Sequence, residues 1–82
     1  MLLEAAMIAS ICGPTEGVLA QLKTRYGEEP LYHAVMPAPG GDTELTITVS
    51  TKGNTWTALI ENPKGLMCVV AVGSNWEAGL PL

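Results

Sequence analysis

The chain has 82 residues, of which 48% are hydrophobic and 15% charged, and its net charge is −4. This length is typical of one domain, and the apolar content excludes an intrinsically disordered chain, which combines low hydrophobicity with high net charge. The four basic residues are scattered along the chain. Contact with several phosphates takes a cluster of cations, so we expect no nucleic-acid binding. No apolar run reaches the length of a bilayer span, so we expect no stable membrane span.

Residues 1–11 are mostly apolar and contain Glu4 but no basic residue. A signal peptide has a positively charged start and a longer apolar stretch. We therefore expect this segment to be either an apolar N-terminal arm or the remnant of a signal peptide. A single domain over residues 12–77 follows, and residues 78–82 form a C-terminal tail.

The first regular element is a helix over residues 14–26. Pro14 stands where the first turn tolerates proline, and Glu16 stands where the helix dipole favours a negative charge. Gly27 follows at a position typical of a C-terminal cap. Apolar side chains recur at helical spacing at Val18, Leu19, Leu22 and Tyr26.

Four later segments have the composition of strands: residues 31–36, 44–51, 55–61 and 66–72. Prolines and glycines make residues 37–42 a loop, and short turns at 52–54 and 62–65 join the last three segments as antiparallel neighbours. The sequence therefore predicts an α+β fold, with one N-terminal helix packed on a three- to four-stranded antiparallel sheet. The helix carries the amphipathic stripe that can cover one face of this sheet.

Residues 44–51 alternate between apolar and polar side chains, as a half-buried strand does. Together with the next strand they place small hydroxyl residues on one face: Thr46, Thr48, Ser50, Thr55 and Thr57. This threonine-rich face could be solvated, or it could support pairing at a sheet edge or contact with a partner.

No set of residues in the chain carries recognisable catalytic chemistry. His33 is the only histidine, and no serine has a nucleophile signature around it. One histidine and two distant cysteines do not make a tetrahedral metal site, and Glu28-Glu29 is typical of a solvated loop after a helix. We therefore expect a protein that is not an enzyme and has no cofactor, catalytic residue or metal site.

Three aromatic residues are candidates for partner contact: Tyr32, Trp56 and Trp76. Aromatic anchors often dominate protein interfaces, and large aromatic side chains also close the cores of small domains. The sequence favours a core position for Trp56 and leaves Trp76 open between packing and contact. The two cysteines also have two interpretations, a Cys12–Cys68 disulfide or two buried free thiols.

Several short pieces of the sequence match a known group in order and spacing: Cys12-Gly13-Pro14, Leu22, Arg25-Tyr26-Gly27-Glu28, Thr55-Trp56-Thr57, Asn62-Pro63-Lys64-Gly65, Cys68-Val69-Val70-Ala71 and Gly73-Ser74-Asn75-Trp76. Through them, residues 12–77 resemble small, uncharacterised secreted or periplasmic proteins of alphaproteobacteria, with similar chains in marine phages and metagenomes. The resemblance implies a disulfide between Cys12 and Cys68 and an extracytoplasmic location. It implies no activity.

The leading hypothesis is a small, non-enzymatic, extracytoplasmic interaction or structural domain that is periplasmic or secreted. Its partner would be another protein or a second copy, bound through the N-terminal arm, the sheet face and Trp76. The alternative is a phage-encoded accessory or virion protein that acts on a host component, located in the virion or in the host cytoplasm. A small hydrolase is a minor third hypothesis.

Overall fold

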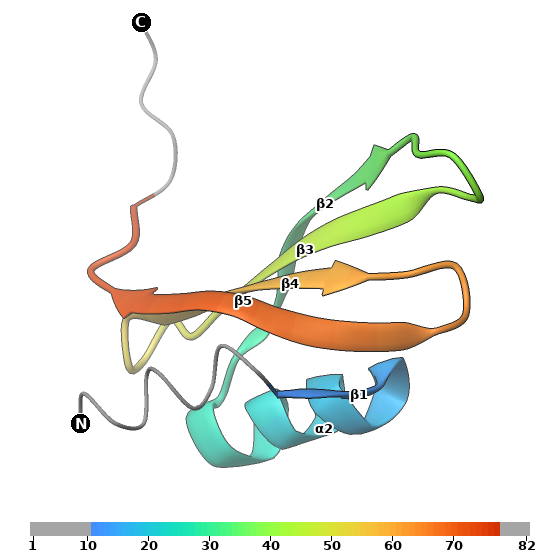
Figure 1. Cartoon of the computed structure of the whole chain (residues 1–82). Coiled ribbons are helices and arrows are strands. Elements are labelled where there is room, and N and C mark those ends of the chain that lie inside the picture. Colours follow the sequence, from blue (N-terminus) through green and yellow to red (C-terminus); the bar gives the residue numbers. More distant parts are fainter. Residues whose placement is uncertain (1–10, 78–82) are drawn as a thin grey trace, which may run out of the picture.

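A computed structural model describes residues 11–77 and shows one helix and five strands (Figure 1). In chain order these are β1 (Cys12–Pro14), α2 (Thr15–Tyr26), β2 (Glu29–Met36), β3 (Thr43–Val49), β4 (Thr55–Glu61) and β5 (Leu66–Ser74). The strands form one antiparallel sheet in the order β1-β5-β4-β3-β2. The predicted arm and C-terminal tail lie outside the described residues, apart from Ile11. The α+β prediction is confirmed.

The helix begins and ends close to the positions that its sequence predicts. Pro14 is its N-cap, and the Thr15 N–H donates a hydrogen bond of 3.2 Å to the Gly65 carbonyl in the β4–β5 turn. At the other end Gly27 adopts φ 68°, a left-handed conformation that glycine takes without strain. The N–H groups of Gly27 and Glu28 then donate to the carbonyls of Lys23 and Leu22, which closes the last turn.

Strand β1 is the element that the sequence did not predict, so the sheet has five strands where three or four were expected. Glycine and proline at its second and third positions are poor strand formers. Its pairing depends instead on a distant segment, because Cys12 lies opposite Cys68 of β5. The Ile11 carbonyl extends this pairing by accepting a 2.9 Å hydrogen bond from the Val69 N–H.

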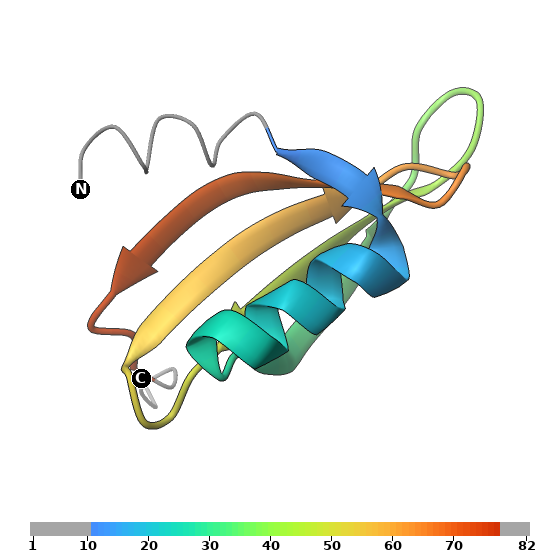
Figure 2. The ribbon, with the colours of Figure 1, turned by 90° about the horizontal axis from the view of Figure 1, so that it is seen from below.

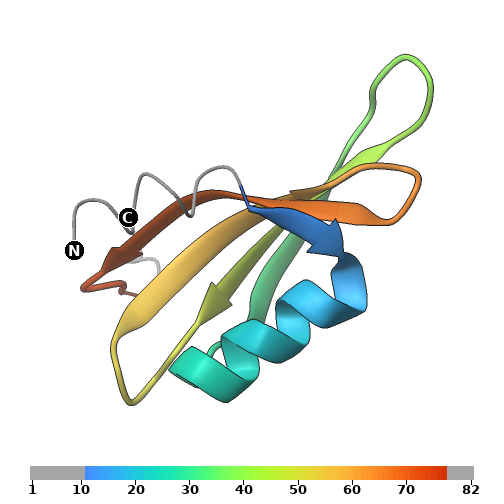
Figure 3. The same cartoon turned by 60° about the horizontal axis from the view of Figure 1, so that its bottom comes forward.

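The helix lies against one face of the sheet, which we call the helix-side face (Figures 2 and 3). Leu22 of α2 forms a buried cluster there with Leu59, Met67 and Val69. Because side chains alternate along a strand and partners across strands share a face, the register places Thr46 opposite Leu59 and Thr48 opposite Thr57 on this same side. The helix therefore covers the face that carries the threonines.

The interpretation of the threonine-rich face as solvated is wrong. Thr46, Thr48, Ser50 and Thr57 are all buried, and the last three are at most 2% exposed. The reason is that β5 is apolar on both sides, so its Met67 and Val69 supply enough apolar surface for the helix on the threonine side. The consistently apolar side of β3 and β4 therefore faces away from the helix.

Candidate functional site

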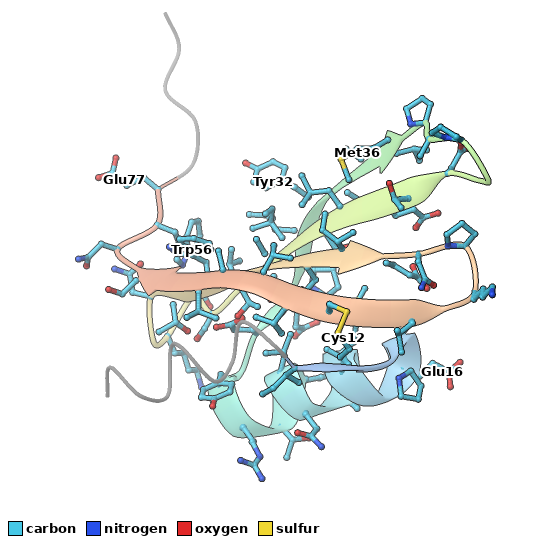
Figure 4. The ribbon with its side chains drawn as sticks, in the orientation of Figure 1. Cys12, Glu16, Tyr32, Met36, Trp56 and Glu77 are labelled. Atoms are coloured by element: carbon cyan, nitrogen blue, oxygen red, sulfur yellow. A yellow bond between two sulfur atoms is a disulfide. The ribbon has the colours of Figure 1, made fainter. Side chains whose placement is uncertain are left out.

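The side of the sheet away from α2 carries a continuous set of apolar side chains, which we call the open face. It extends over three strands and comprises Tyr32, Ala34 and Met36 of β2, Leu45, Ile47 and Val49 of β3, and Trp56, Ala58 and Ile60 of β4. Figure 4 shows Tyr32, Met36 and Trp56 projecting on this side. No described helix or strand covers them.

Exposure on the open face increases toward β2. Val49 and Ala58 are 8% and 9% exposed because their neighbours on the face shield them, whereas Tyr32 is 54% exposed. None of the nine side chains is charged, and the register adds Thr43 opposite Met36 and the exposed Glu29 opposite Val49 on the same side. In an antiparallel sheet with one covered face, the uncovered face is normally the polar one. Here the polarity is inverted, because the threonines lie under the helix and the uncovered face carries apolar side chains. Of the nine, Tyr32, Ala34 and Met36 are exposed, and the other six are half-buried or buried.

Two of the three predicted contact residues belong to this surface. Tyr32 is a β2 residue of the open face, and Trp56 is a half-buried β4 residue on the same face. The Trp56 ring lies across Gly73 of β5, where a Cβ added to the glycine would fall 2.6 Å from the ring. Glycine at this position therefore lets the indole lie flat against the sheet.

Trp76 has a different position, beside the β3–β4 turn. Its indole N–H donates a 3.1 Å hydrogen bond to the Ser50 carbonyl, and the Asn75 N–H donates to the Asn54 carbonyl at 2.8 Å. These bonds fix the segment after β5 against the turn. The half-buried Trp76 ring thus packs at the end of the sheet beside the β3–β4 turn, and its N–H already has a hydrogen-bond acceptor within the protein.

The helix-side face contains a polar cluster that the sequence reasoning missed. Glu28 is 3% exposed, and its carboxylate accepts hydrogen bonds from three threonine hydroxyls. Oε1 accepts from Thr48 at 2.8 Å and from Thr57 at 2.7 Å, while Oε2 accepts from Thr55 at 2.8 Å. The interpretation of Glu28 as part of a solvated loop is wrong. Glycine after the helix turns the chain inward, so the next side chain enters the space between helix and sheet.

A groove of about 560 Å³ opens between α2 and the sheet beside this cluster. Its apolar walls include Val18 and Leu22 of the helix and Val69 and Val72 of β5. The volume is in the range of small-molecule sites. The hydroxyls of Thr48, Thr55 and Thr57 donate their hydrogen bonds to the Glu28 carboxylate. These polar groups beside the groove therefore hold the segment after the helix to the sheet.

His33 lies on the exposed part of β2, where its Nε2 is 2.8 Å from Glu44 Oε1. The side chains of His33 and Glu44 are 55% and 41% exposed, so the pair is a surface contact of small energetic weight. Within residues 11–77, His33 has no hydrogen bond to a serine or threonine hydroxyl. Over the same range no group of three or more His, Cys, Asp or Glu side chains is placed to hold a metal ion.

The disulfide between Cys12 and Cys68 is present, as the resemblance implied, and no described cysteine is free. It joins directly opposed residues of β1 and β5, with their Cα atoms 4.0 Å apart, and spans 56 residues of sequence. It therefore fixes the start of the domain to its last strand.

In the part of the chain that the structure describes, no helix is long and apolar enough to cross a membrane. Comparison of the chain with protein-family models, with curated proteins and with solved structures returns no match.

Proposed function

We propose that this protein is a small, non-enzymatic, extracytoplasmic binding module whose open face is its contact surface for a protein partner. One observation carries the proposal: the sheet buries Thr46, Thr48 and Thr57 on the helix side, while no described helix or strand covers the apolar side chains of the open face, where Tyr32 is 54% exposed. These side chains contribute little hydrophobic stabilisation to the monomer, because that stabilisation comes from removing apolar surface from water. A partner laid on the open face would remove it.

The disulfide supports an extracytoplasmic compartment, periplasmic or secreted. Disulfides form and persist in oxidising environments and are rare where thioredoxin and glutathione keep thiols reduced. The bridge here closes a long loop in a domain that buries only six hydrophobic side chains among its described residues. Small domains that bury so few apolar side chains depend on additional covalent cross-links such as disulfides.

The open face also has the composition of a contact surface. Tyrosine and tryptophan are enriched at the energetic centres of interfaces, while charged residues are depleted there. Tyr32 and Trp56 provide two aromatic side chains among the aliphatic ones and the Met36 thioether, and Thr43 and Glu29 are the polar residues that the register adds at the two ends of β2. Met36 is 36% exposed, and its flexible side chain adapts to the shape of a partner.

The proposal is tested by selecting binders from a random peptide library against the oxidised protein and then measuring them on two variants. Ile47→Lys places a charge at the centre of the open face, and Thr24→Lys places the same charge on the exposed surface of the helix. We expect the selected peptides to lose at least about tenfold in affinity for Ile47→Lys, which is about 1.4 kcal/mol, and to bind Thr24→Lys like the original protein.

Circular dichroism of both variants controls for folding. Equal peptide affinities for a folded Ile47→Lys and the original protein would contradict the proposal. Binding of the apolar dye anilinonaphthalene sulfonate gives a second measurement that needs no selected ligand. The same change should reduce dye fluorescence if the open face is accessible, and unchanged fluorescence would count against an uncovered apolar surface.

A further inference from the structure

Strand β2 is exposed along its whole length and has a neighbour on one side only. It ends the sheet order, and all eight of its residues are exposed. Of the eight large hydrophobic residues that the described chain exposes, four are on this one strand: Leu31 at 46%, Tyr32 at 54%, Val35 at 51% and Met36 at 36%. The helix therefore shields neither face of β2, and no described residue pairs with its outer edge.

Proteins usually protect such an edge with lysine, proline, a bulge or a short strand. Pro30 and the irregularity between Pro30 and Tyr32 protect only the beginning of β2. From Tyr32 to Met36 the pairing with β3 is regular, and the five residues include no lysine, arginine, aspartate or glutamate. The opposite edge of the sheet differs, because β1 has three residues, ends in Pro14 and is tied down by the disulfide.

We infer that β2 pairs antiparallel with β2 of a second copy, so that two five-stranded sheets join edge to edge as one sheet of ten strands. A two-fold axis perpendicular to the sheet near His33 or Ala34 produces this arrangement, because it reverses the strand direction and leaves each open face on the same side. The unpaired backbone groups of both edges are satisfied in one step.

The sequence of the strand favours a second copy as the occupant of this edge. With the axis at His33, Tyr32 lies opposite Ala34 of the second copy, and with the axis at Ala34 it lies opposite Met36. Both arrangements place apolar side chains opposite each other on the open face. The chain as a whole has a net charge of −4, but the paired stretch brings no acidic side chain opposite another. The two open faces also become neighbours in one larger surface.

Sedimentation equilibrium on the oxidised protein tests the inference, from about 1 µM to about 1 mM. We expect a mass that rises from 8.6 kDa toward twice that value as the concentration increases. Val35→Lys should raise the dimer dissociation constant at least about tenfold. Val35 pairs with Glu44 of β3, so the new lysine has an acidic neighbour within its own copy and the β2–β3 pairing is preserved. Thr24→Lys is the matched control and should dimerise like the original protein.

Single-cysteine variants then locate the contact. A residue near the two-fold axis lies opposite the same residue of the second copy. Oxidation should therefore link either the His33→Cys or the Ala34→Cys variant into a covalent dimer. It should not link the Thr24→Cys variant, whose cysteine is on the helix. A protein that stays at 8.6 kDa up to about 1 mM would overturn the inference. So would a dimer that Ile47→Lys dissociates and Val35→Lys leaves intact, because that dimer would pair open face to open face.

Discussion

Replacement of Glu28 by alanine is the change that best tests how the helix is held to the sheet. It removes three hydrogen bonds and leaves the hydroxyls of Thr48 and Thr57, which are 0% and 2% exposed, without their main acceptor. Each buried group left unsatisfied costs about 1–3 kcal/mol. Loss of the buried charge offsets part of this. We expect Glu28→Ala to lower the free energy of unfolding by about 3 kcal/mol.

That loss is large for this chain, because domains have about 0.05–0.15 kcal/mol of stability per residue. Urea unfolding under non-reducing conditions measures it as a lower midpoint at an unchanged slope. Glu28→Gln is the matched control. Its amide oxygen can accept from Thr48 and Thr57 while its NH₂ group donates to Thr55, so it should lose about 1 kcal/mol or less. A loss below about 1 kcal/mol for alanine, or equal losses for both variants, would refute the hydrogen-bond explanation.

Four further outcomes are expected. Replacing both Cys12 and Cys68 by alanine should cost about 4 kcal/mol in the unfolding free energy measured by urea, from the loop-closure entropy of the 56-residue separation. The native protein should take up no alkylating agent without reductant, as intact mass will show. Gly73→Ala should destabilise by about 1–3 kcal/mol and shift tryptophan fluorescence, because its Cβ would lie 2.6 Å from the Trp56 ring. Gly17→Ala, with nothing within 4 Å of its Cβ, should instead stabilise the helix by about 0.5–1 kcal/mol in the same titration.

The elements that local patterns determine were predictable from the sequence. Pro14 and Gly27 mark the ends of the helix, and the alternation from Leu45 to Val49 marks a strand. Strand β1 was not predictable, because Cys12–Pro14 has no strand propensity and pairs only through a residue 56 positions away. A short edge strand of this kind is determined by tertiary contact alone.

Which face the helix would cover could not be predicted from β3. The alternation assigns Leu45 and Thr46 to opposite faces but does not say which face is inside. The covered face depends on β5, whose Met67 and Cys68 are apolar and point to opposite faces, so that the helix could pack against either face. Glu28 is the residue that indicates which face is covered. A carboxylate directly after a glycine cap can reach a row of hydroxyls on the sheet face that lies against the helix. Residue type alone makes Tyr32 and Trp56 candidates for contact, and the strand register places both on one surface.

The Glu28 cluster also has a consequence for the order in which the chain folds. The three hydroxyls that bind this carboxylate come from β3 and β4, and Thr48 and Thr57 become neighbours only when these two strands pair in register. Hairpins form in about 1–10 µs from contacts close in sequence, whereas the helix exit and β4 are 29 residues apart at Glu28 and Thr57. We therefore expect the β3–β4 hairpin to form before the helix docks on it, and mutations that slow formation of this hairpin to slow folding of the whole domain.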